Sequence, residues 1–131
     1  MIVIKSSTKF FLVFICISSL TSFSTRANNI QIQQIGPTLE KPWGMDFIND
    51  HELLVTEKNG RIYQINISDG SSSEIHNVPK VSSALQGGLL DIIYNDGVIY
   101  YCYSKDTSNG TVLAIDSANI VNDKLIERLT I

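Results

Sequence analysis

One pattern of strands and turns occurs twice in this chain, 44 residues apart, and constrains the fold more than any other feature. The first copy, GMDFINDHELLVTEKNGRIYQINI, begins at Gly44, and the second, GLLDIIYNDGVIYYCYSKDTSNGTVLAI, begins at Gly88. Each copy holds a glycine, an apolar strand, a tight polar turn, a longer apolar strand, a turn with Asn-Gly and a third strand. A period of about 40–50 residues with four strands in each unit is typical of β-propeller blades.

The predicted strands are short, rich in Ile, Val, Leu and Tyr, and separated by turns of Gly, Asn and Asp. They cover residues 44–48, 52–58, 61–67, 72–78, 89–95, 98–105, 111–117 and 124–131. The fifth and sixth strands are apolar at nearly every position, so they need cover on both faces, which stacked blades supply. Alternation predicts an isolated strand at 29–35. The Asn and Asp residues of IDSANIVNDKL, residues 115–125, favour a loop over a helical turn.

Residues 41–131 provide two blades, whereas a propeller typically has about four to eight. We therefore expect an all-β fold in which residues 28–131 form the incomplete N-terminal portion of a β-propeller domain. The alternative is a small independent β-sandwich.

The first 27 residues differ in character from the rest of the chain. Lys5 and Lys9 precede an apolar stretch at 10–20, and small and polar residues follow as far as Ala27. This order is typical of a secretory signal peptide, and the apolar stretch is short for a membrane span. We predict that residues 1–27 are removed and that the protein is exported to the periplasm or outside the cell. An uncleaved anchor helix is the alternative.

Charge and cysteine content exclude some classes of function. The net charge of −3 offers no basic surface for nucleic acid and no polybasic patch for a membrane. Removal of the leader takes Cys16 with it, so Cys102 has no partner for an internal disulfide. Cys102 lies in an apolar run and is predicted to be a buried small hydrophobic residue. No nearby cation in the sequence marks it as a reactive thiol.

Other polar residues give no strong site. His51 in a turn and His76 in a predicted strand have no further ligands at metal-binding spacing, so no metal site is predicted. Residues 106–111 resemble part of a calcium loop but lack its later bidentate acid. Asn66 and Asn109 fit the N-glycosylation pattern, which matters only in a host that uses it.

Five motifs occur in order and at regular spacing. They are LEKPWGMDF at 39–47, ELLVTEKNGRIYQI at 52–65, NVPKV at 77–81, LQGGLLDI at 85–92 and VIYYCYS at 98–104. Together they resemble the N-terminal part of the soluble quinoprotein sugar dehydrogenases, the glucose/sorbosone or aldose sugar dehydrogenase family. The resemblance implies a six-bladed propeller that holds pyrroloquinoline quinone (PQQ) and calcium. It also implies oxidation of the C1 hydroxyl of an aldose, with an external electron acceptor.

The resemblance gives this chain one site residue. The glutamine of the Gln-Gly-Gly motif is Gln86, which the family places at the sugar site, and an amide suits a pair of hydroxyls because it both donates and accepts. The resemblance implies that the catalytic histidine, the arginines at the cofactor and the calcium ligands belong to blades beyond residue 131. Asp46, where a small or apolar residue is usual, and the short turn at 94–97 depart from the family pattern.

The sequence leads to two hypotheses about function. The first is an N-terminal portion of a PQQ-dependent aldose dehydrogenase, inactive by itself, with no catalytic residue and only Gln86 at the substrate. The second is a non-catalytic exported module that binds a partner or associates with copies of itself through uncovered blade edges.

Overall fold

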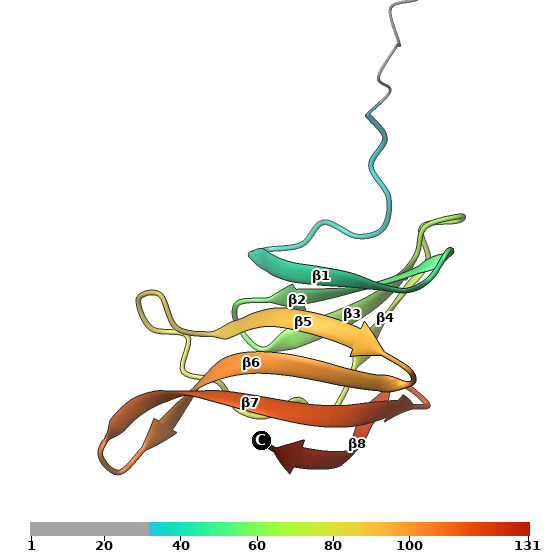
Figure 1. Cartoon of the computed structure of the whole chain (residues 1–131). Helices are drawn as coiled ribbons and strands as arrows, with labels where there is room; N and C mark the ends of the chain where they lie inside the picture. Colours follow the sequence, from blue (N-terminus) through green and yellow to red (C-terminus); the bar gives the residue numbers. More distant parts are fainter. Residues whose placement is uncertain (1–31) are drawn as a thin grey trace, which may run out of the picture. The chain divides into compact units, whose positions relative to one another are not determined.

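The computed structural model describes residues 32–131, in which every regular element is a β-strand (Figure 1). The strands form two antiparallel sheets, each with its strands in sequence order. Blade 1 consists of β1 (Pro42–Asn49), β2 (Glu52–Glu57), β3 (Arg61–Asn66) and β4 (Ser72–Ile75). Blade 2 consists of β5 (Leu89–Asn95), β6 (Val98–Thr107), β7 (Gly110–Val121) and β8 (Lys124–Thr130). The predicted signal peptide, residues 1–27, lies outside the described residues. No helix in the described part has the length and hydropathy of a membrane span.

All eight strands predicted for the repeat are present, and all except β5 have changed ends. The prediction of a loop within 115–125 is wrong, because β7 continues to Val121 and pairs with β8. Asn122 and Asp123 form the whole connection, at φ values of 50° and 57°. Asn and Asp tolerate this left-handed conformation, so these residues make a two-residue hairpin turn rather than a loop.

The isolated strand expected at 29–35 is absent from its described part. Residues 32–35 form no strand, and Ile32 and Ile35 are exposed. A strand needs a partner for its backbone groups, and neither sheet pairs with this segment. Alternation of apolar residues therefore gave a wrong prediction here.

A single apolar core lies between the two blades. It is built from the facing sides of both sheets, and its buried members are Leu54, Ile62, Ile75, Leu89, Ile92, Ile99, Tyr101, Tyr103, Ala114, Ala118 and Leu125. Alternate residues of a strand point to opposite faces, so each sheet gives one set of side chains to this core. The prediction that blades cover one another is confirmed for this pair of faces.

Polar contacts also join the blades. The Thr56 hydroxyl lies 2.5 Å from the Leu90 carbonyl oxygen of β5, to which it donates. Asp46 Oδ2 accepts a hydrogen bond of 2.8 Å from the Tyr94 amide of β5. The acidic residue that departs from the family pattern is therefore a link between the blades.

Two smaller predictions need correction. His76 lies outside β4, just after Ile75, and bridges to Lys124 of β8 through its backbone. Cys102 is half-buried rather than buried, because its side chain lies on the face of blade 2 that points away from blade 1. That face has no second sheet against it in the described part of the chain.

Candidate functional site

Gln86 lies at the tip of a tight turn just before β5. The Gly87 amide donates to the Ala84 carbonyl oxygen at 2.8 Å and closes the turn. Leu85 has a φ of 50° and is 92% exposed, while Gln86 itself is exposed. A leucine in the left-handed region costs roughly 1–2 kcal/mol, so the turn holds a strained backbone beside the glutamine.

The glycine pair allows this turn to lie against blade 1. A Cβ atom on Gly88 would lie 2.3 Å from the Lys58 carbonyl oxygen, and the φ of Gly88 is 141°. A Cβ atom on Gly87 would lie 2.5 Å from the Ser82 carbonyl oxygen. Only glycine fits either position, because any side chain would meet backbone atoms that cannot move independently. The close approach lets the Leu89 amide donate to the Lys58 carbonyl oxygen at 3.0 Å.

Lys58 connects the Gln86 turn to the start of blade 1. Its ammonium group donates to the Leu85 carbonyl oxygen. The same nitrogen lies 6.0 Å from the centre of the Trp43 ring, within the range of a cation–π contact. Gly44 packs against Asp91, so the beginnings of β1 and β5 lie side by side. Trp43, Lys58 and the Gln86 turn therefore form one candidate site at this end of the two blades.

A buried acid supports the Trp43 side of the site. Glu57 is 1% exposed, and its carboxylate pairs with Arg61 Nε at 2.7 Å. The carboxylate also accepts a hydrogen bond from the Glu40 amide. Arg61 reaches Glu40 Oε2 at 3.1 Å as well, so the chain leading into Trp43 is fixed by charged groups.

Gln86 is the site residue that the sequence predicted, whereas Trp43, Lys58 and Glu57 had no predicted role. All three residues lie inside motifs already recognised, at 39–47 and 52–65. The Asn59-Gly60 hairpin signal bears on Lys58, because it places this residue in the turn directly after β2. Their contact with the Gln86 turn depends on how the blades pack.

The remaining polar candidates lie apart from this site. His51 is exposed in the turn after β1, and the His76 side chain is exposed beside β8. Asp106 accepts a hydrogen bond from Thr111, and hydrogen bonds from Ser82 and Thr111 lower the pKa of Asp106.

The residues around Gln86 do not by themselves fit PQQ and calcium. Residues 32–131 contain no group of three His, Cys, Asp or Glu side chains that could hold a metal ion. Lys58 is the cation that contacts the Gln86 turn, and it is already bonded to the Leu85 carbonyl oxygen. An anionic quinone with a metal ion needs several cations and oxygen ligands. The residues around Gln86 therefore fit a contact with a substrate, but they do not provide the groups that would hold the cofactor.

Comparison with known proteins gives a consistent result. The family model described as glucose/sorbosone dehydrogenase matches residues 39–131. The aldose sugar dehydrogenase YliI of Escherichia coli K12 is 35% identical over 86 residues, which are 64% of this chain and 23% of that protein. The uncharacterised protein slr1608 of Synechocystis is 28% identical over 102 residues, which are 68% of this chain and 25% of that protein. The chain thus spans about a quarter of the length of these curated relatives.

Solved structures share the fold. The soluble aldose sugar dehydrogenase of Escherichia coli, in its apo form, matches with a TM-score of 0.63 and 28% identity, over 70% of this chain and 29% of that one. A glucose dehydrogenase matches with a TM-score of 0.65 and 27% identity, over 70% and 32% of the two chains. The PQQ-bound aldose sugar dehydrogenase of Streptomyces coelicolor matches with a TM-score of 0.66 over 76% and 32%, and at 22% identity it supports the fold alone. These neighbours are β-propellers, so the two sheets are two propeller blades.

Proposed function

Because this chain belongs to the glucose/sorbosone dehydrogenase family, we propose that it forms part of an enzyme that oxidises the C1 hydroxyl of aldose sugars with PQQ. The family match and the aldose sugar dehydrogenase relative support sugar oxidation. The PQQ-bound form of a neighbour with the same fold is consistent with that cofactor. The observation that carries the proposal is the exposed Gln86 turn, held against Lys58 where β1 and β5 begin.

In this proposal Gln86 binds the sugar and does not act on its bonds. Its amide offers two donors and an acceptor, which can bridge two neighbouring hydroxyl groups. Lys58 holds the turn in place through the Leu85 carbonyl oxygen. One neutral hydrogen bond contributes roughly 0.5–1.5 kcal/mol, so losing the amide weakens turnover by about tenfold at most.

We further propose that residues 32–131 are inactive by themselves. The described residues hold no metal cluster, and no histidine lies near the Gln86 turn. A general base typically contributes about a hundred- to ten-thousand-fold in rate. A histidine base, the arginines and the calcium ligands would come from further blades, as the resemblance implies.

The test compares two proteins in a dye-linked assay of aldose oxidation with added PQQ. The first is the 131-residue chain, for which no turnover is expected. The second is a chimera in which residues 39–131 replace the matching segment of the Escherichia coli aldose sugar dehydrogenase. In the chimera, Gln86→Ala should leave PQQ affinity unchanged and lower kcat/KM by up to about tenfold.

A matched control in the chimera is Asn95→Ala, because Asn95 is an exposed amide at the opposite end of β5 from the Gln86 turn. It should leave both PQQ affinity and kcat/KM unchanged. Loss of PQQ affinity with intact sugar kinetics in Gln86→Ala would contradict the role given to Gln86. Turnover by the 131-residue chain alone would contradict its inactivity.

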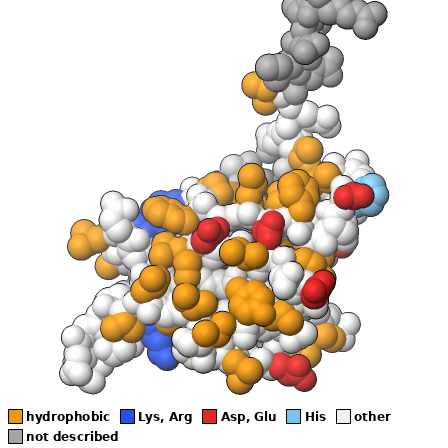
Figure 2. All heavy atoms as spheres, in the orientation of Figure 1, with side chains coloured by type: hydrophobic (Ala, Val, Ile, Leu, Met, Phe, Trp, Pro, Cys, Tyr) orange, Lys and Arg blue, Asp and Glu red, His pale blue; other side chains and the backbone are white. Residues whose placement is uncertain are grey.

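A second candidate function is a self-associating module, favoured by uncovered apolar faces. Blade 2 exposes large apolar side chains on the face opposite blade 1, among them Ile93, Leu113, Ile115 and Leu129. Figure 2 shows hydrophobic side chains spread over the strands of blade 2 in this view. Such surfaces favour association. Light scattering after size exclusion should show a multimer, and a monomer that unfolds cooperatively would contradict this candidate.

We also propose export through the predicted leader. The basic start, the stretch at 10–20 and Ala27 support it. N-terminal sequencing of the secreted protein should begin at or near Asn28. A mature protein that retains residues 10–20 would instead indicate a membrane anchor.

A further inference from the structure

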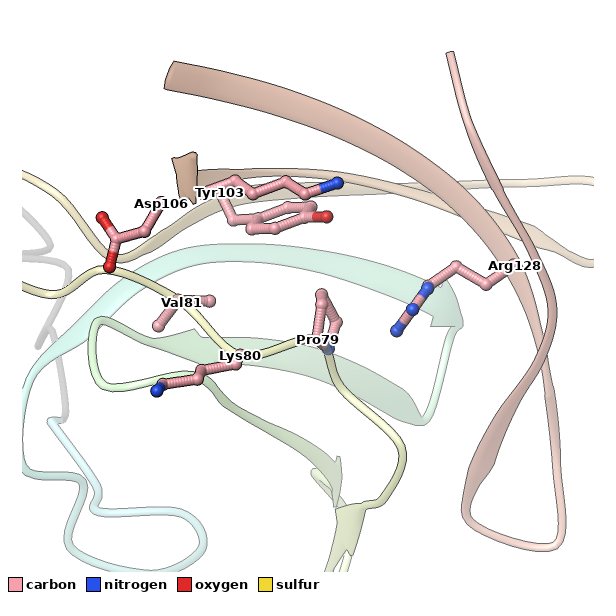
Figure 3. A pocket seen from close by; sticks show the side chains of 7 residues that line it. Pro79, Lys80, Val81, Tyr103, Asp106 and Arg128 are labelled. Atoms are coloured by element: carbon pink, nitrogen blue, oxygen red, sulfur yellow. The ribbon is translucent and has the colours of Figure 1, made fainter. Parts of the chain in front are cut away.

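A cavity of about 430 Å³ opens between blade 2 and the chain that connects the two blades. Residues 79–81 of the connecting chain line one side, and Tyr103, Lys105, Asp106 and Arg128 line the other (Figure 3). The residues of the Gln86 turn are not among its lining residues. The cavity is therefore a separate site, and the inference below does not depend on the proposed function.

The wall of the cavity on blade 2 is a fixed polar network. The Tyr103 hydroxyl donates to Asp116 Oδ2 at 3.2 Å, and Asp116 is 1% exposed. Thr130 donates to Asp116 Oδ1 at 2.8 Å, and Arg128 Nε lies 3.3 Å from Oδ2. Burial raises the pKa of Tyr103, and the Asp116 carboxylate adds to this shift. Tyr103 therefore remains a neutral donor at neutral pH.

Arg128 extends from this network toward the connecting chain. Its Nη1 donates to the Asn77 carbonyl oxygen at 3.4 Å, while Nε stays with Asp116. Figure 3 shows the Arg128 side chain extending toward Pro79 of the connecting chain, at the edge of the cavity that it lines. A guanidinium group has five N–H donors, so Arg128 keeps donors for an anion after these contacts.

The charges of the site leave one positive charge uncompensated. Lys80, Lys105 and Arg128 are cations, Asp106 lines the cavity, and Asp116 lies behind it. Hydrogen bonds lower the pKa of Asp106, so its carboxyl group is ionised at neutral pH. The whole chain carries a net charge of −3, so this positive site contrasts with the rest of the molecule.

We propose that this cavity binds a small organic anion with one carboxylate and several hydroxyl groups. The carboxylate contacts Arg128 and Lys105, which suit a planar two-oxygen group and a point charge respectively. The hydroxyl groups donate to Asp106 and accept from Lys80. The volume lies at the small end of the range for small-molecule sites, and Pro79 and Val81 supply apolar contact.

Isothermal titration calorimetry at low salt tests the proposal on the 131-residue chain with D-gluconate as the probe. D-sorbitol, an acyclic neutral polyol of the same length, is the control for charge, and inorganic phosphate is the control for the hydroxyl groups. We expect binding of gluconate, no binding of sorbitol and weaker binding of phosphate. Lys105→Ala and Lys80→Ala should each weaken gluconate binding by about three- to tenfold.

Lys124→Ala is the matched control variant, because Lys124 is an exposed lysine at the opposite end of β8 from Thr130 and does not line the cavity. It should bind gluconate like the unmodified chain. The same titration in the chimera described above keeps the test valid if the short chain does not fold well. Absence of gluconate binding in the folded protein, equal affinity for phosphate, or equal weakening by Lys124→Ala would each overturn the proposal.

Discussion

The second strands of the two blades, β2 and β6, have similar apolar composition but very different burial. In β2, four consecutive residues from Leu54 to Glu57 are buried, although their side chains point to opposite faces. In β6, Tyr101 is buried, whereas Tyr100 beside it is 37% exposed. The difference comes from the neighbours, because β2 has blade 2 on one side and the chain before β1 near the other.

The packing of Gly36 shows how the face of blade 1 that points away from blade 2 is covered. A Cβ atom on Gly36 would lie 2.8 Å from the Ile65 side chain, so the segment before β1 packs on the far face of blade 1. The far face of blade 2 has no such segment in residues 32–131, and Ile93 and Ile115 are exposed there. An apolar strand therefore indicates that both faces of its blade need cover, and the neighbouring segments of the chain decide whether each face is covered.

The largest expected effect tests this difference directly. Leu54→Ala removes a fully buried side chain from the core between the blades and should lower the free energy of unfolding by about 2–5 kcal/mol. Tyr100→Ala, on the uncovered face of blade 2, should cost less than about 1 kcal/mol. Urea unfolding followed by circular dichroism measures both. Equal losses would show that the far face of blade 2 is covered in solution.

The second-largest effect on stability is expected at the contact between Gly88 and Lys58. Gly88→Ala should cost roughly 2–4 kcal/mol, since the new Cβ atom meets the Lys58 carbonyl oxygen and the positive φ strains alanine. Gly97 is the matched control, because it also has a positive φ but nothing lies within 4 Å of its Cβ position. Gly97→Ala should therefore cost only the strain, about 1 kcal/mol. Thermal unfolding separates the two variants, and equal shifts would remove the blade contact from the explanation.

Thr56 and Cys102 sharpen the comparison of the two faces. Thr56 is buried, accepts from the Gly44 amide at 2.9 Å and donates to Leu90 of blade 2. Thr56→Val leaves both groups unsatisfied and should cost about 1–3 kcal/mol. Cys102→Val, on the uncovered face of blade 2, should change stability by less than about 0.5 kcal/mol. Denaturant unfolding of both variants checks this, and a harmless Thr56→Val would mean that the bond adds nothing to blade packing.

The smallest effect at neutral pH concerns the tyrosines buried in blade 2. Burial raises the pKa of Tyr101, with the Asp116 carboxylate adding to the shift, and its hydroxyl has no hydrogen-bond partner among the described residues. A phenol in the unfolded chain ionises near pH 10, while the folded protein keeps this proton. Stability is therefore intact below about pH 10 and falls as the pH rises, by up to about 1.4 kcal/mol per pH unit for each such tyrosine.

Tyr101→Phe removes the hydroxyl group that causes this pH dependence and keeps the buried ring. The variant should match the unmodified protein at pH 7 and lose less stability between about pH 10 and pH 12. Unfolding free energies across this pH range provide the measurement. An unchanged slope above pH 10 would show that Tyr101 ionises normally in the folded protein.

Much of the fold was predictable because strand and turn signals are local. The Asn59-Gly60 turn joins β2 to β3 as predicted, and β5 has the predicted ends. The errors occurred where local signals were ambiguous. Asn122 and Asp123 were compatible with a loop or a hairpin turn, and only pairing of β7 with β8 selects the turn. The alternation before residue 36 had no partner strand, which sequence periodicity does not reveal.

The candidate site was only partly predictable. Gln86 stood out because a motif contains it, and the tight fit of the glycine pair follows the expected use of glycine. Lys58 lies 28 positions earlier in the chain, and its bond to Leu85 crosses from blade 1 to the turn before blade 2. The anion cavity joins residues 79–81 to Arg128, and no motif connects these segments.

The sequence by itself determined the repeat, the strands, the turns and the family, because each depends on residues that are close together in the chain. The tertiary structure decided which apolar faces are covered, that Asp46 bonds to Tyr94, and that Cys102 is half-buried rather than buried. It also placed Lys80, Lys105 and Arg128 around one cavity. Burial and charge clustering are properties of packed surfaces, and packing brings together residues that the chain keeps far apart.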